Sequence, residues 1–238
     1  MSPYCAFDIE IANPLPDGIE DWKSARPLGI TCAATCLEGQ QPRVWFGKNP
    51  DGSPSERMTR REAAEMVDFL KQTAATHTLL TWNGLGFDFD ILAEESGRLQ
   101  DCRSLAWNHV DMMFHVFCLK GFAIGLDKAA KGMGLPGKTE GMHGDLAPRY
   151  WKEGKRDLVL QYVAQDVRTT LDLALAVDGL RKLRWITAAG GSRDMPIPRW
   201  LTAREAVNLP EPDMSWQKNP WKRSKFTGWL QEEQLTLF

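Results

Sequence analysis

Residues 4–11 read Tyr-Cys-Ala-Phe-Asp-Ile-Glu-Ile, an apolar run that carries two acidic side chains. The run predicts a β-strand. Residues two apart on a strand project from the same face, so Asp8 and Glu10 should point to one place. The intervening and flanking apolar residues should face the opposite, buried side: Phe7, Ile9 and Ile11. This stretch therefore predicts a sheet that buries one side of its N-terminal strand and gathers two carboxylates on the other.

Two more acidic residues end short motifs farther along the chain. Asp88 ends Trp-Asn-Gly-Leu-Gly-Phe-Asp (82–88), directly after an apolar run. Asp166 ends Tyr-Val-Ala-Gln-Asp (162–166), inside a long helical pattern. Tyr162 and Asp166 are four residues apart, so they share one face of a helix. The sequence thus offers four carboxylates and a phenol for one site.

Each motif taken alone has a simpler interpretation. Asp8 and Glu10 could lie on a solvated strand edge, and Asn83 could cap a helix whose dipole Asp88 complements. The phenol and the last carboxylate could form a surface helix pair. Together the motifs favour a metal site, because hard divalent cations such as Mg²⁺ prefer carboxylate oxygens. Two such ions about 4 Å apart can orient an attacking water and stabilise the leaving oxygen of a phosphodiester.

The order, spacing and neighbours of these motifs resemble the three exonuclease motifs of the DEDD superfamily of 3′–5′ exonucleases. The resemblance spans roughly residues 4–175. Tyr162 is similar to the tyrosine of the tyrosine-type branch (DEDDy), and Gln161 does not fit the histidine-type branch. The segment at residues 125–138 looks like the connection before the third motif in exonucleases related to the proofreading domain of B-family polymerases. A helix with a glycine stop and a surface turn is the alternative for that segment.

The resemblance implies roles for the carboxylates and the phenol. Four carboxylates would hold two Mg²⁺ ions, for which Mn²⁺ should substitute: Asp8, Glu10, Asp88 and Asp166. Asp8 would bridge both ions, with Glu10 and Asp166 on the ion that activates water. Asp88 would act mainly on the second ion, and Tyr162 would orient the nucleophile. Glu10 would also touch the terminal 3′-hydroxyl.

The resemblance also implies substrate contacts. Asn83 and Phe87 would support the second motif and the terminal nucleotide, and Lys138 would border the substrate groove. The substrate would be DNA with a single-stranded 3′ end. Activity should fall in mild acid and disappear with chelator, because clustered carboxylates repel one another until cations bind.

The last five residues, Gln-Leu-Thr-Leu-Phe, closely resemble the pentapeptide with which bacterial polymerases and repair proteins bind the sliding clamp. Leu235, Leu237 and Phe238 would be the apolar anchors in a groove, and Gln234 would orient the peptide. The alternative is a final strand packed on the domain. Between this peptide and the core, we expect Trp185 and Trp200 to pack, and either packing or base stacking for three more tryptophans: Trp216, Trp221 and Trp229.

Charge and composition set wider limits. The net charge of −2 gives no overall basic field of the kind that drives non-specific nucleic-acid binding. Two local clusters could still touch phosphates: Arg149, Lys152, Lys155 and Arg156, which also fit a solvated helix face, and Lys218, Lys222, Arg223 and Lys225. The five cysteines lack disulfide or zinc spacing, and Cys32 and Cys36 should pack in the core. Without a signal peptide or a run of ~20 apolar residues, we expect a cytoplasmic protein with no membrane partner.

The expected elements follow the order of an α/β protein. Strands are predicted at residues 4–12, 28–37, 43–47 and 78–82. Helices are predicted at 59–75, within 84–97, and at 111–120, 125–134, 157–183 and 203–208. Capping boxes, Thr59 with Glu62 and Thr202 with Glu205, begin the first and the last of these helices. The resemblance makes this a ribonuclease H-like fold, a mixed central sheet flanked by helices, with a C-terminal tail. It divides the chain into an exonuclease domain (1–190), an extension or tether (191–233) and the clamp-binding peptide (234–238).

These inferences converge on a metal-dependent 3′–5′ exonuclease that hydrolyses DNA from 3′ ends in replication or repair, tethered to the sliding clamp. An RNA-trimming exoribonuclease is the alternative within the same class, since such a site distinguishes sugars only if nearby groups contact the 2′-hydroxyl. A non-catalytic clamp-binding adaptor is the alternative outside it.

Overall fold

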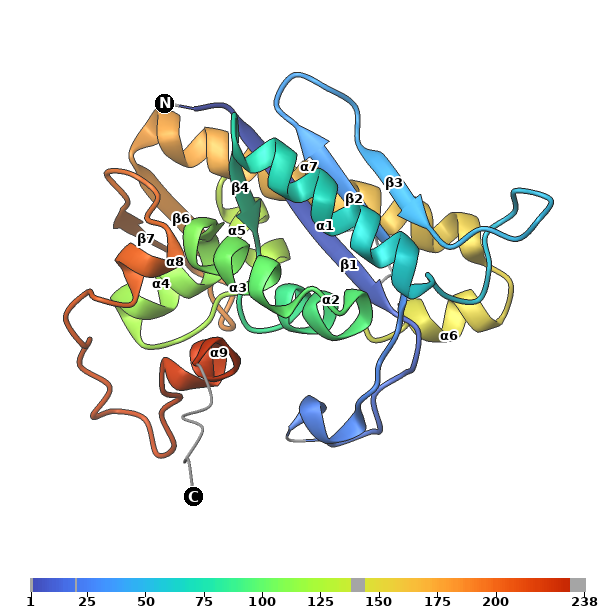
Figure 1. Cartoon of the computed structure of the whole chain (residues 1–238). Coiled ribbons are helices and arrows are strands. Elements are labelled where there is room, and N and C mark those ends of the chain that lie inside the picture. The colour runs from blue at the N-terminus through green and yellow to red at the C-terminus, as the bar shows by residue number, and fades with distance from the viewer. Residues whose placement is uncertain (1, 20, 138–143, 232–238) are drawn as a thin grey trace.

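A mixed five-stranded sheet forms the centre of the molecule (Figure 1). The computed structural model describes residues 2–19, 21–137 and 144–231. The strand order is β3-β2-β1-β4-β5, with β1 antiparallel to β2 and parallel to β4. The strands are β1 (Tyr4–Ile11), β2 (Ile30–Leu37), β3 (Arg43–Phe46), β4 (Thr78–Thr81) and β5 (Val110–Asp111). The mixed sheet confirms the predicted fold class.

Helices cover both faces of this sheet. They are α1 (Arg60–Ala74), α2 (Asp88–Ser96), α3 (Leu99–Asn108), α4 (Met112–Lys120), α5 (Leu126–Gly132), α6 (Ala147–Lys152), α7 (Arg156–Leu180), α8 (Ala203–Ala206) and α9 (Ser224–Thr227), with short 3-10 turns η1 (Trp22–Ala25) and η2 (Gly228–Leu230). Figure 1 shows α7 behind the sheet and α1 in front of it. The predicted capping boxes are present, with Thr59 opening α1 and Thr202 opening α8.

The alternation of β1 builds two cores, one on each face of the sheet. Phe7 and Ile9 are buried in a cluster with Met66 of α1 and with residues of α2. Ala6 is buried in a second cluster with Val163 of α7. Since Asp8 shares its face with Ala6, the two acidic residues of β1 project toward α7. The predicted burial of the intervening apolar residues is confirmed.

Two elements differ from the sequence prediction at the end of α7. The helix expected to run to residue 183 ends at Leu180, and Arg181 adopts a left-handed backbone with φ of 54°. The next residues form β6 (Lys182–Ile186), which pairs with β7 (Ser192–Pro196) in an antiparallel hairpin. The reason is a change of period: Leu183 and Trp185 are buried while Lys182 and Arg184 are exposed, which is strand alternation. The sequence patterns also did not indicate α3, α6, α9 or the short strand β5.

The residues after β7 pack onto the core. Side chains along this extension are buried as far as Leu230: Ile197, Trp200, Ala203, Ala206, Phe226 and Leu230. The boundary expected after residue 190 falls in the turn of the β6–β7 hairpin. Trp185 and Trp200 are buried as predicted. All five cysteines are free and buried, which agrees with core packing of Cys32 and Cys36. In the described part of the chain, none of the helices has the length and apolarity to cross a membrane.

One guanidinium holds the extension together. The side chain of Arg223 is 11% exposed. It donates hydrogen bonds to the carbonyls of Val207 at 2.7 Å, Leu209 at 2.6 Å and Pro210 at 2.9 Å, and to that of Cys118 in α4 at 3.3 Å. The carbonyls of Val207, Leu209 and Pro210 belong to the segment after α8, which has little regular structure, so hydrogen bonds from the guanidinium replace those of a helix or sheet there.

We predict that Arg223→Met lowers the free energy of unfolding by about 2–4 kcal/mol, because several carbonyls lose a charged donor. Urea unfolding followed by circular dichroism measures this change. Arg61→Met is the control: Arg61 pairs only with Glu65 and its side chain is 88% exposed, so stability should hardly change. Equal stability of the two variants would contradict this role for Arg223.

Candidate functional site

The residues that we predict to bind metal and to catalyse the reaction line one cavity of about 360 Å³ at the carboxyl end of β1. The cavity lies between β1, the start of α2, α6 and α7. Seven of the predicted residues line it: Asp8, Glu10, Asn83, Phe87, Asp88, Tyr162 and Asp166. Lys138 and the four predicted clamp contacts (Gln234, Leu235, Leu237 and Phe238) lie outside the described residues.

The backbone of β1 places its two carboxylates. Asp8 is partly exposed and Glu10 is buried. The pairing of β1 with β2 changes register between Glu10 and Ile11, and the hydroxyl of Thr31 donates to the Glu10 carbonyl at 3.0 Å. Such irregularities at a strand end are frequent beside active sites, because they change the direction of side chains.

Asp88 is tied to β1 by a backbone hydrogen bond. Its Oδ1 accepts from the amide of Ile9 at 2.9 Å, and its carboxyl group shares a hydrogen bond with that of Asp8. Burial raises the pKa of Asp88 to about 7, the amide of Ile9 opposes this rise, and the nearby Asp111 adds to it. A hydrogen bond between two carboxyl groups requires a proton on one of them, because an ionised carboxylate can only accept.

The loop before Asp88 is held by an acidic residue that the sequence analysis did not assign to the site. The carboxylate of Asp111 accepts hydrogen bonds from the amides of Asn83 at 3.1 Å, Leu85 at 2.9 Å and Phe114 at 2.9 Å. Burial raises its pKa to about 6. In the sequence, Asp111 directly precedes the apolar run of α4, and a single acid at such a position is the pattern of a helix N-cap.

Asn83 does not cap a helix. It adopts a left-handed backbone with φ of 78°, which asparagine tolerates better than most residues. The helix α2 begins only at Asp88, and Phe87 before it makes no side-chain capping bond. The capping alternative for Asn83 is therefore wrong, and Asp88 occupies the first position of the helix, where its charge faces the positive end of the helix dipole.

Tyr162 and Asp166 lie one above the other on α7, as their spacing predicts. Tyr162 is 1% exposed and forms a side-chain hydrogen bond with Asp166. Burial, followed by the charges of Asp166, Glu10 and Asp8, raises the pKa of Tyr162 far above its usual value. The phenol therefore keeps its proton at neutral pH and can only act here as a hydrogen-bonding group, not as a general base.

The donor set suits a hard divalent cation in its chemistry. Among the described residues, no three His, Cys, Asp or Glu side chains are grouped closely enough to form a ready-made metal site. The four carboxylates nevertheless line one cavity, and two of them share a hydrogen bond. All of their ligand atoms are oxygens, which Mg²⁺ and Mn²⁺ accept. The residues therefore fit such an ion by their chemistry.

A second hollow of about 480 Å³ continues from the first on the other side of the carboxylates. Asp8 and Asp166 line both hollows, and Gly125 to Lys128 at the start of α5 line the second. An exposed cation stands at each side: Arg149 of α6 borders the first hollow and Lys128 the second. The carboxylates thus lie in the middle of a groove whose two arms each contain one of these cations, together with further acids: Asp17 and Asp145 in the first arm and Asp127 in the second.

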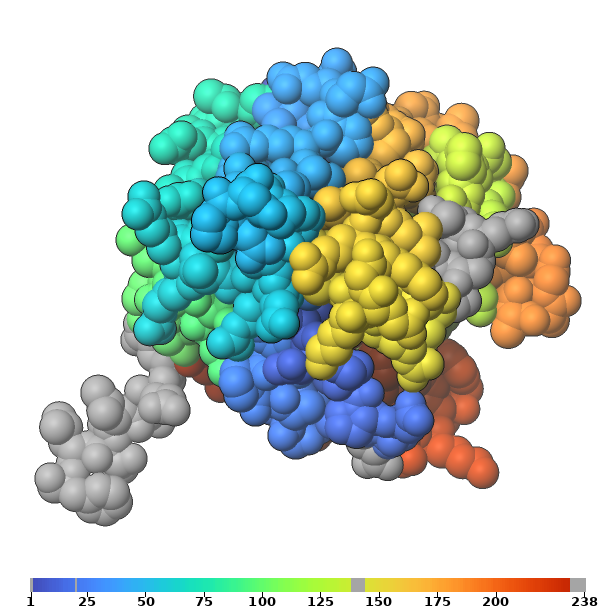
Figure 2. Space-filling model, turned by 90° about the vertical axis from the view of Figure 1, so that its right-hand side faces the viewer, coloured from blue at the N-terminus to red at the C-terminus, as the bar shows by residue number. Residues whose placement is uncertain are grey.

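The loop between β1 and β2 forms one wall of the first hollow. Pro14 and Leu15 line it opposite α6. Figure 2 shows this N-terminal loop, in blue, directly below the α6 region, in yellow. Trp22 packs edge-on against Phe87 with ring centres 5.0 Å apart, and Arg26 forms an ion pair with the buried Asp90 of α2 at 2.6 Å. These contacts fix the wall to the helix that carries Asp88.

The C-terminal extension packs against the loop that carries Asn83 and Phe87. The indole nitrogen of Trp229 donates to the carbonyl of Leu85 at 2.7 Å. The ring of Phe226 lies so close to Gly86 that an added Cβ would be 3.0 Å from it. The guanidinium of Arg103 in α3 in turn donates to the Trp229 carbonyl. The extension therefore supports the site from behind, although its residues do not line the cavity.

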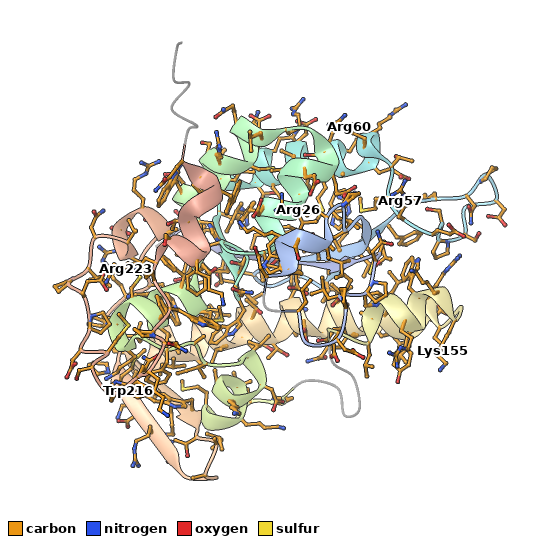
Figure 3. The ribbon with its side chains drawn as sticks, turned by 90° about the horizontal axis from the view of Figure 1, so that it is seen from below. Arg26, Arg57, Arg60, Lys155, Trp216 and Arg223 are labelled. Atoms are coloured by element: carbon orange, nitrogen blue, oxygen red, sulfur yellow. The ribbon has the colours of Figure 1, made fainter. Side chains whose placement is uncertain are left out.

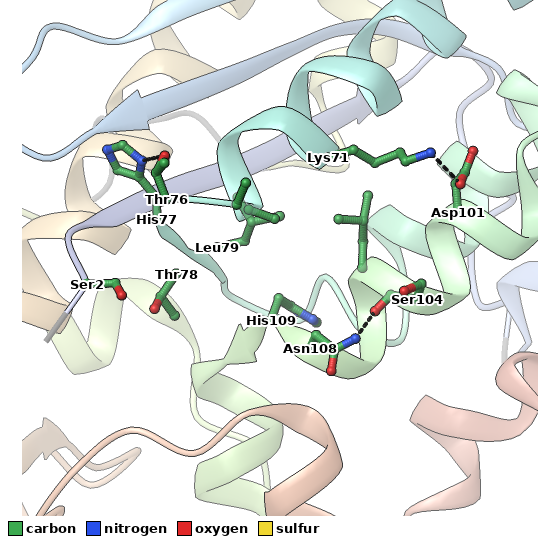
Figure 4. A pocket seen from close by; sticks show the side chains of 13 residues that line it. Ser2, Lys71, Thr76, His77, Thr78, Leu79, Asp101, Ser104, Asn108 and His109 are labelled. Atoms are coloured by element: carbon green, nitrogen blue, oxygen red, sulfur yellow. Dashed lines mark hydrogen bonds and ion pairs between the residues drawn. The ribbon is translucent and has the colours of Figure 1, made fainter.

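A separate cavity of about 480 Å³ lies at the other end of β4, between α1 and α3 (Figure 4). Two pairs of polar side chains are already formed along it: Lys71 with Asp101 at 2.7 Å and His77 with Thr76 at 2.8 Å. None of the predicted site residues that the structure describes lines it.

The raised pKa of Asp88 predicts that the difference in stability between the wild type and a variant without this charge depends on pH. Because the folded protein binds this proton more tightly than the unfolded chain, the contribution of Asp88 to folding is complete in acid and is lost as the pH rises through its folded pKa of about 7. Asp88→Asn keeps the acceptor for Ile9 and removes the charge. Without metal, the variant should be more stable than wild type by on the order of 1–3 kcal/mol near pH 8, and the gain should shrink toward pH 5.

Denaturant titrations across this pH range, in chelator, measure the difference. Asp157→Asn, an exposed acid in the first turn of α7, is the control and should show no such dependence. A stability difference for Asp88→Asn that is the same at every pH would refute the prediction.

Comparisons with known proteins agree with this fold. The family described as the RNase_H superfamily matches residues 51–177, which include Asp88, Tyr162 and Asp166. A search of curated proteins finds no match. The family B DNA polymerase of the archaeon Pyrobaculum calidifontis is similar in structure, with a TM-score of 0.54 and 23% identity over 74% of this chain and 24% of the polymerase.

Two structures of exonuclease I are also similar. The product-bound structure has a TM-score of 0.44 and 15% identity over 75% of this chain and 44% of that chain. The other, described as suggesting how processivity is achieved, has a TM-score of 0.45 and 16% identity over 75% of this chain and 41% of that chain. This chain therefore spans less than half the length of each of the three proteins. On the family match and the architecture of its sheet, the chain belongs to the ribonuclease H superfamily.

Proposed function

We propose that the protein is a metal-dependent 3′–5′ exonuclease of the tyrosine-type DEDD group that hydrolyses DNA from single-stranded 3′ ends. The observation that carries this proposal is the meeting of four carboxylates and a protonated phenol in one open groove. A purely structural role would not require several buried or half-buried acids side by side, because burying charge is costly. This argument also disfavours a non-catalytic adaptor.

The roles of the residues are those that the resemblance to the DEDD exonucleases implies. Asp8, Glu10, Asp88 and Asp166 would hold two Mg²⁺ ions, with Asp8 bridging them, Glu10 and Asp166 on the first and Asp88 mainly on the second. When bound, such ions supply an activated water and positive charge at the leaving oxygen. Tyr162 would orient that water through its hydroxyl. Its proton is retained, so it acts as a donor rather than as a base.

Substrate contacts would come from the two arms of the groove. Arg149 and Lys128 are placed to neutralise phosphates on either side of the carboxylates. Phe87, held by Trp22, and Asn83 would support the terminal nucleotide, and Glu10 would touch its 3′-hydroxyl. Lys138 would add a contact at the border of the groove. Mn²⁺ should substitute for Mg²⁺, because the ligands are all oxygens.

We predict that Asp166→Asn reduces the hydrolysis of single-stranded DNA by at least about a hundredfold, because an uncharged amide binds divalent cations more weakly than a carboxylate. Asp157→Asn lies on the same helix, is exposed and does not line the groove, so it serves as the matched control with wild-type activity. Timed digestion of an end-labelled oligonucleotide, with Mg²⁺ and with excess EDTA, measures both. Full activity of Asp166→Asn, or hydrolysis undiminished in EDTA, would rule out the mechanism.

The same assay separates the possible substrates. Digestion of a strand labelled at its 5′ end gives a descending ladder if nucleotides leave from the 3′ end, as we expect. Parallel RNA and duplex DNA substrates test the alternative of an RNA-trimming enzyme. If the enzyme prefers RNA, then the substrate is RNA and not DNA, but the proposed site and mechanism are unchanged.

We also propose that residues 234–238 bind a sliding clamp, with Leu235, Leu237 and Phe238 as anchors and Gln234 as the orienting group. The support is the sequence of the peptide. In this proposal residues 1–190 form the nuclease and residues 191–233 the extension, which is not a free tether, because buried side chains attach it as far as Leu230. The protein would then act in DNA replication or repair on clamp-loaded DNA.

Deleting residues 234–238 should abolish association with the cognate clamp and any stimulation on clamp-loaded DNA, because a tether raises the effective concentration of the enzyme. Leu237→Ala combined with Phe238→Ala should have the same effect. A clamp pull-down and thermal melting of each variant measure binding and folding separately. Destabilisation of the variants with unaltered clamp binding would support a packed final strand instead.

A further inference from the structure

Trp216 is a large apolar side chain that the fold leaves in solvent. It is 65% exposed, more than any other tryptophan among the described residues. The ring is nevertheless held in place: its indole nitrogen donates to the carbonyl of Asp213 at 3.2 Å, and its ring centre lies 6.0 Å from that of Phe122 in an edge-on contact. An aromatic ring that is both exposed and fixed is suited to binding a ligand, because little entropy is lost on contact.

The turn that presents Trp216 is attached to the body of the protein. The side-chain amide of Gln217 donates to the carbonyl of Gly121 at 2.8 Å. Gly121 has a φ of 77°, and a Cβ there would collide with Met214, so the turn packs directly on the glycine. The amide of Ser215 donates to Asp213 at 2.9 Å. These contacts give the exposed indole a defined position next to the segment that leads into α5.

That segment connects Trp216 to the groove. Phe122, against which Trp216 packs, lies three residues before Gly125, and Gly125 to Lys128 line the second hollow beside Asp8 and Asp166. The indole of Trp82, which lines both hollows, donates to the carbonyl of Ile124 at 3.0 Å. In the view from below, Trp216 and Arg223, both on the C-terminal extension, lie on the same side of the molecule (Figure 3). A strand leaving the carboxylates through the second hollow would pass Lys128 and then reach Phe122 and Trp216.

Cations follow Trp216 along the chain. The turn itself contains one exposed acid, Asp213, and residues 214–230 contain four cations: Lys218, Lys222, Arg223 and Lys225. The three lysines are exposed, although the whole chain carries a net charge of −2. Aromatic rings combined with exposed cations form the usual binding surface for single-stranded nucleic acid, in which bases stack on the rings and phosphates meet the cations.

Trp221 lies on the same extension, but its ring already has contacts within the protein. It is 44% exposed, but the ammonium of Lys225 lies 3.5 Å from its ring centre and Phe226 packs near it at 6.2 Å. Its ring is therefore already occupied by contacts within the protein. Trp221 is a matched control for Trp216: the same residue type on the same extension, without an open position next to the groove.

We propose that Trp216 is a stacking platform for an unpaired base of single-stranded nucleic acid that extends out of the groove, with Lys128 and Lys218 as phosphate contacts along the way. The proposal rests on the proposed nuclease function and specifies how the substrate is held beyond the reacting end. It assigns the extension a role in binding long strands rather than in the chemistry.

The test is the affinity for oligothymidylates of increasing length, from about three to about fifteen nucleotides, measured by fluorescence anisotropy in EDTA so that the strand stays intact. Trp216→Ala should weaken binding at least about fivefold for strands long enough to reach the platform, and Trp216→Phe should restore most of the loss. Trp221→Ala should stay within about twofold of wild type. Lys218→Gln should lower the slope of log affinity against log salt by about one.

Equal affinities of Trp216→Ala and wild type at every length would overturn the proposal, and so would a loss that is the same for the shortest and the longest strand. Thermal melting of each variant shows whether the fold is intact, and a folded Trp216→Phe keeps the test decisive if Trp216→Ala melts early. Wild-type digestion of DNA and RNA is measured in parallel. A wild type that digests neither would refute the proposed function, whereas digestion with no effect of Trp216→Ala on binding would refute only the platform.

Discussion

The hydrogen bond from the amide of Ile9 to Asp88 is the contact on which the site depends. It joins the first residue of α2 to the strand that carries Asp8 and Glu10, two segments almost eighty residues apart in the sequence. This hydrogen bond fixes the side chain of Asp88 relative to the backbone of β1, so the acids of α2 and β1 are held at the same place. The helix α7 then needs only to pack on β1 to bring Tyr162 and Asp166 to the same place, and the buried contacts of Ala6 and Val163 provide that packing.

This arrangement concentrates negative charge where solvent is scarce, and backbone amides compensate for part of the cost. Asp88 accepts from one amide, and Asp111 accepts from three others, including those of Asn83 and Leu85. The compensation is incomplete, since burial raises the pKa of both residues, to about 7 and about 6. Acids that resist ionisation in the free protein gain most from a cation. The same electrostatics that make the metal-free site less stable at neutral pH therefore favour metal binding.

Sequence patterns predicted the parts of the fold that depend on interactions between residues close together in the sequence. The alternation of β1, the capping box of α1 and the four-residue spacing of Tyr162 and Asp166 were all found in the structure. Contacts between residues far apart in the sequence were not predictable in this way. Asp111, on the next strand, accepts a hydrogen bond from the amide of Asn83, and Trp229, near the other end of the chain, donates one to the carbonyl of Leu85. The β6–β7 hairpin was missed because Leu180 and Leu183 continue the apolar spacing of Val177 past Gly179, which hides the change to strand alternation.

The measurement that tests the central claim most directly is anomalous diffraction from crystals of the wild-type protein soaked in Mn²⁺. The account predicts two Mn²⁺ peaks about 4 Å apart, held by Asp8, Glu10, Asp88 and Asp166, with the hydroxyl of Tyr162 beside a water on one of them. Strong Mn²⁺ peaks elsewhere on the protein, with none among these four carboxylates, would contradict it.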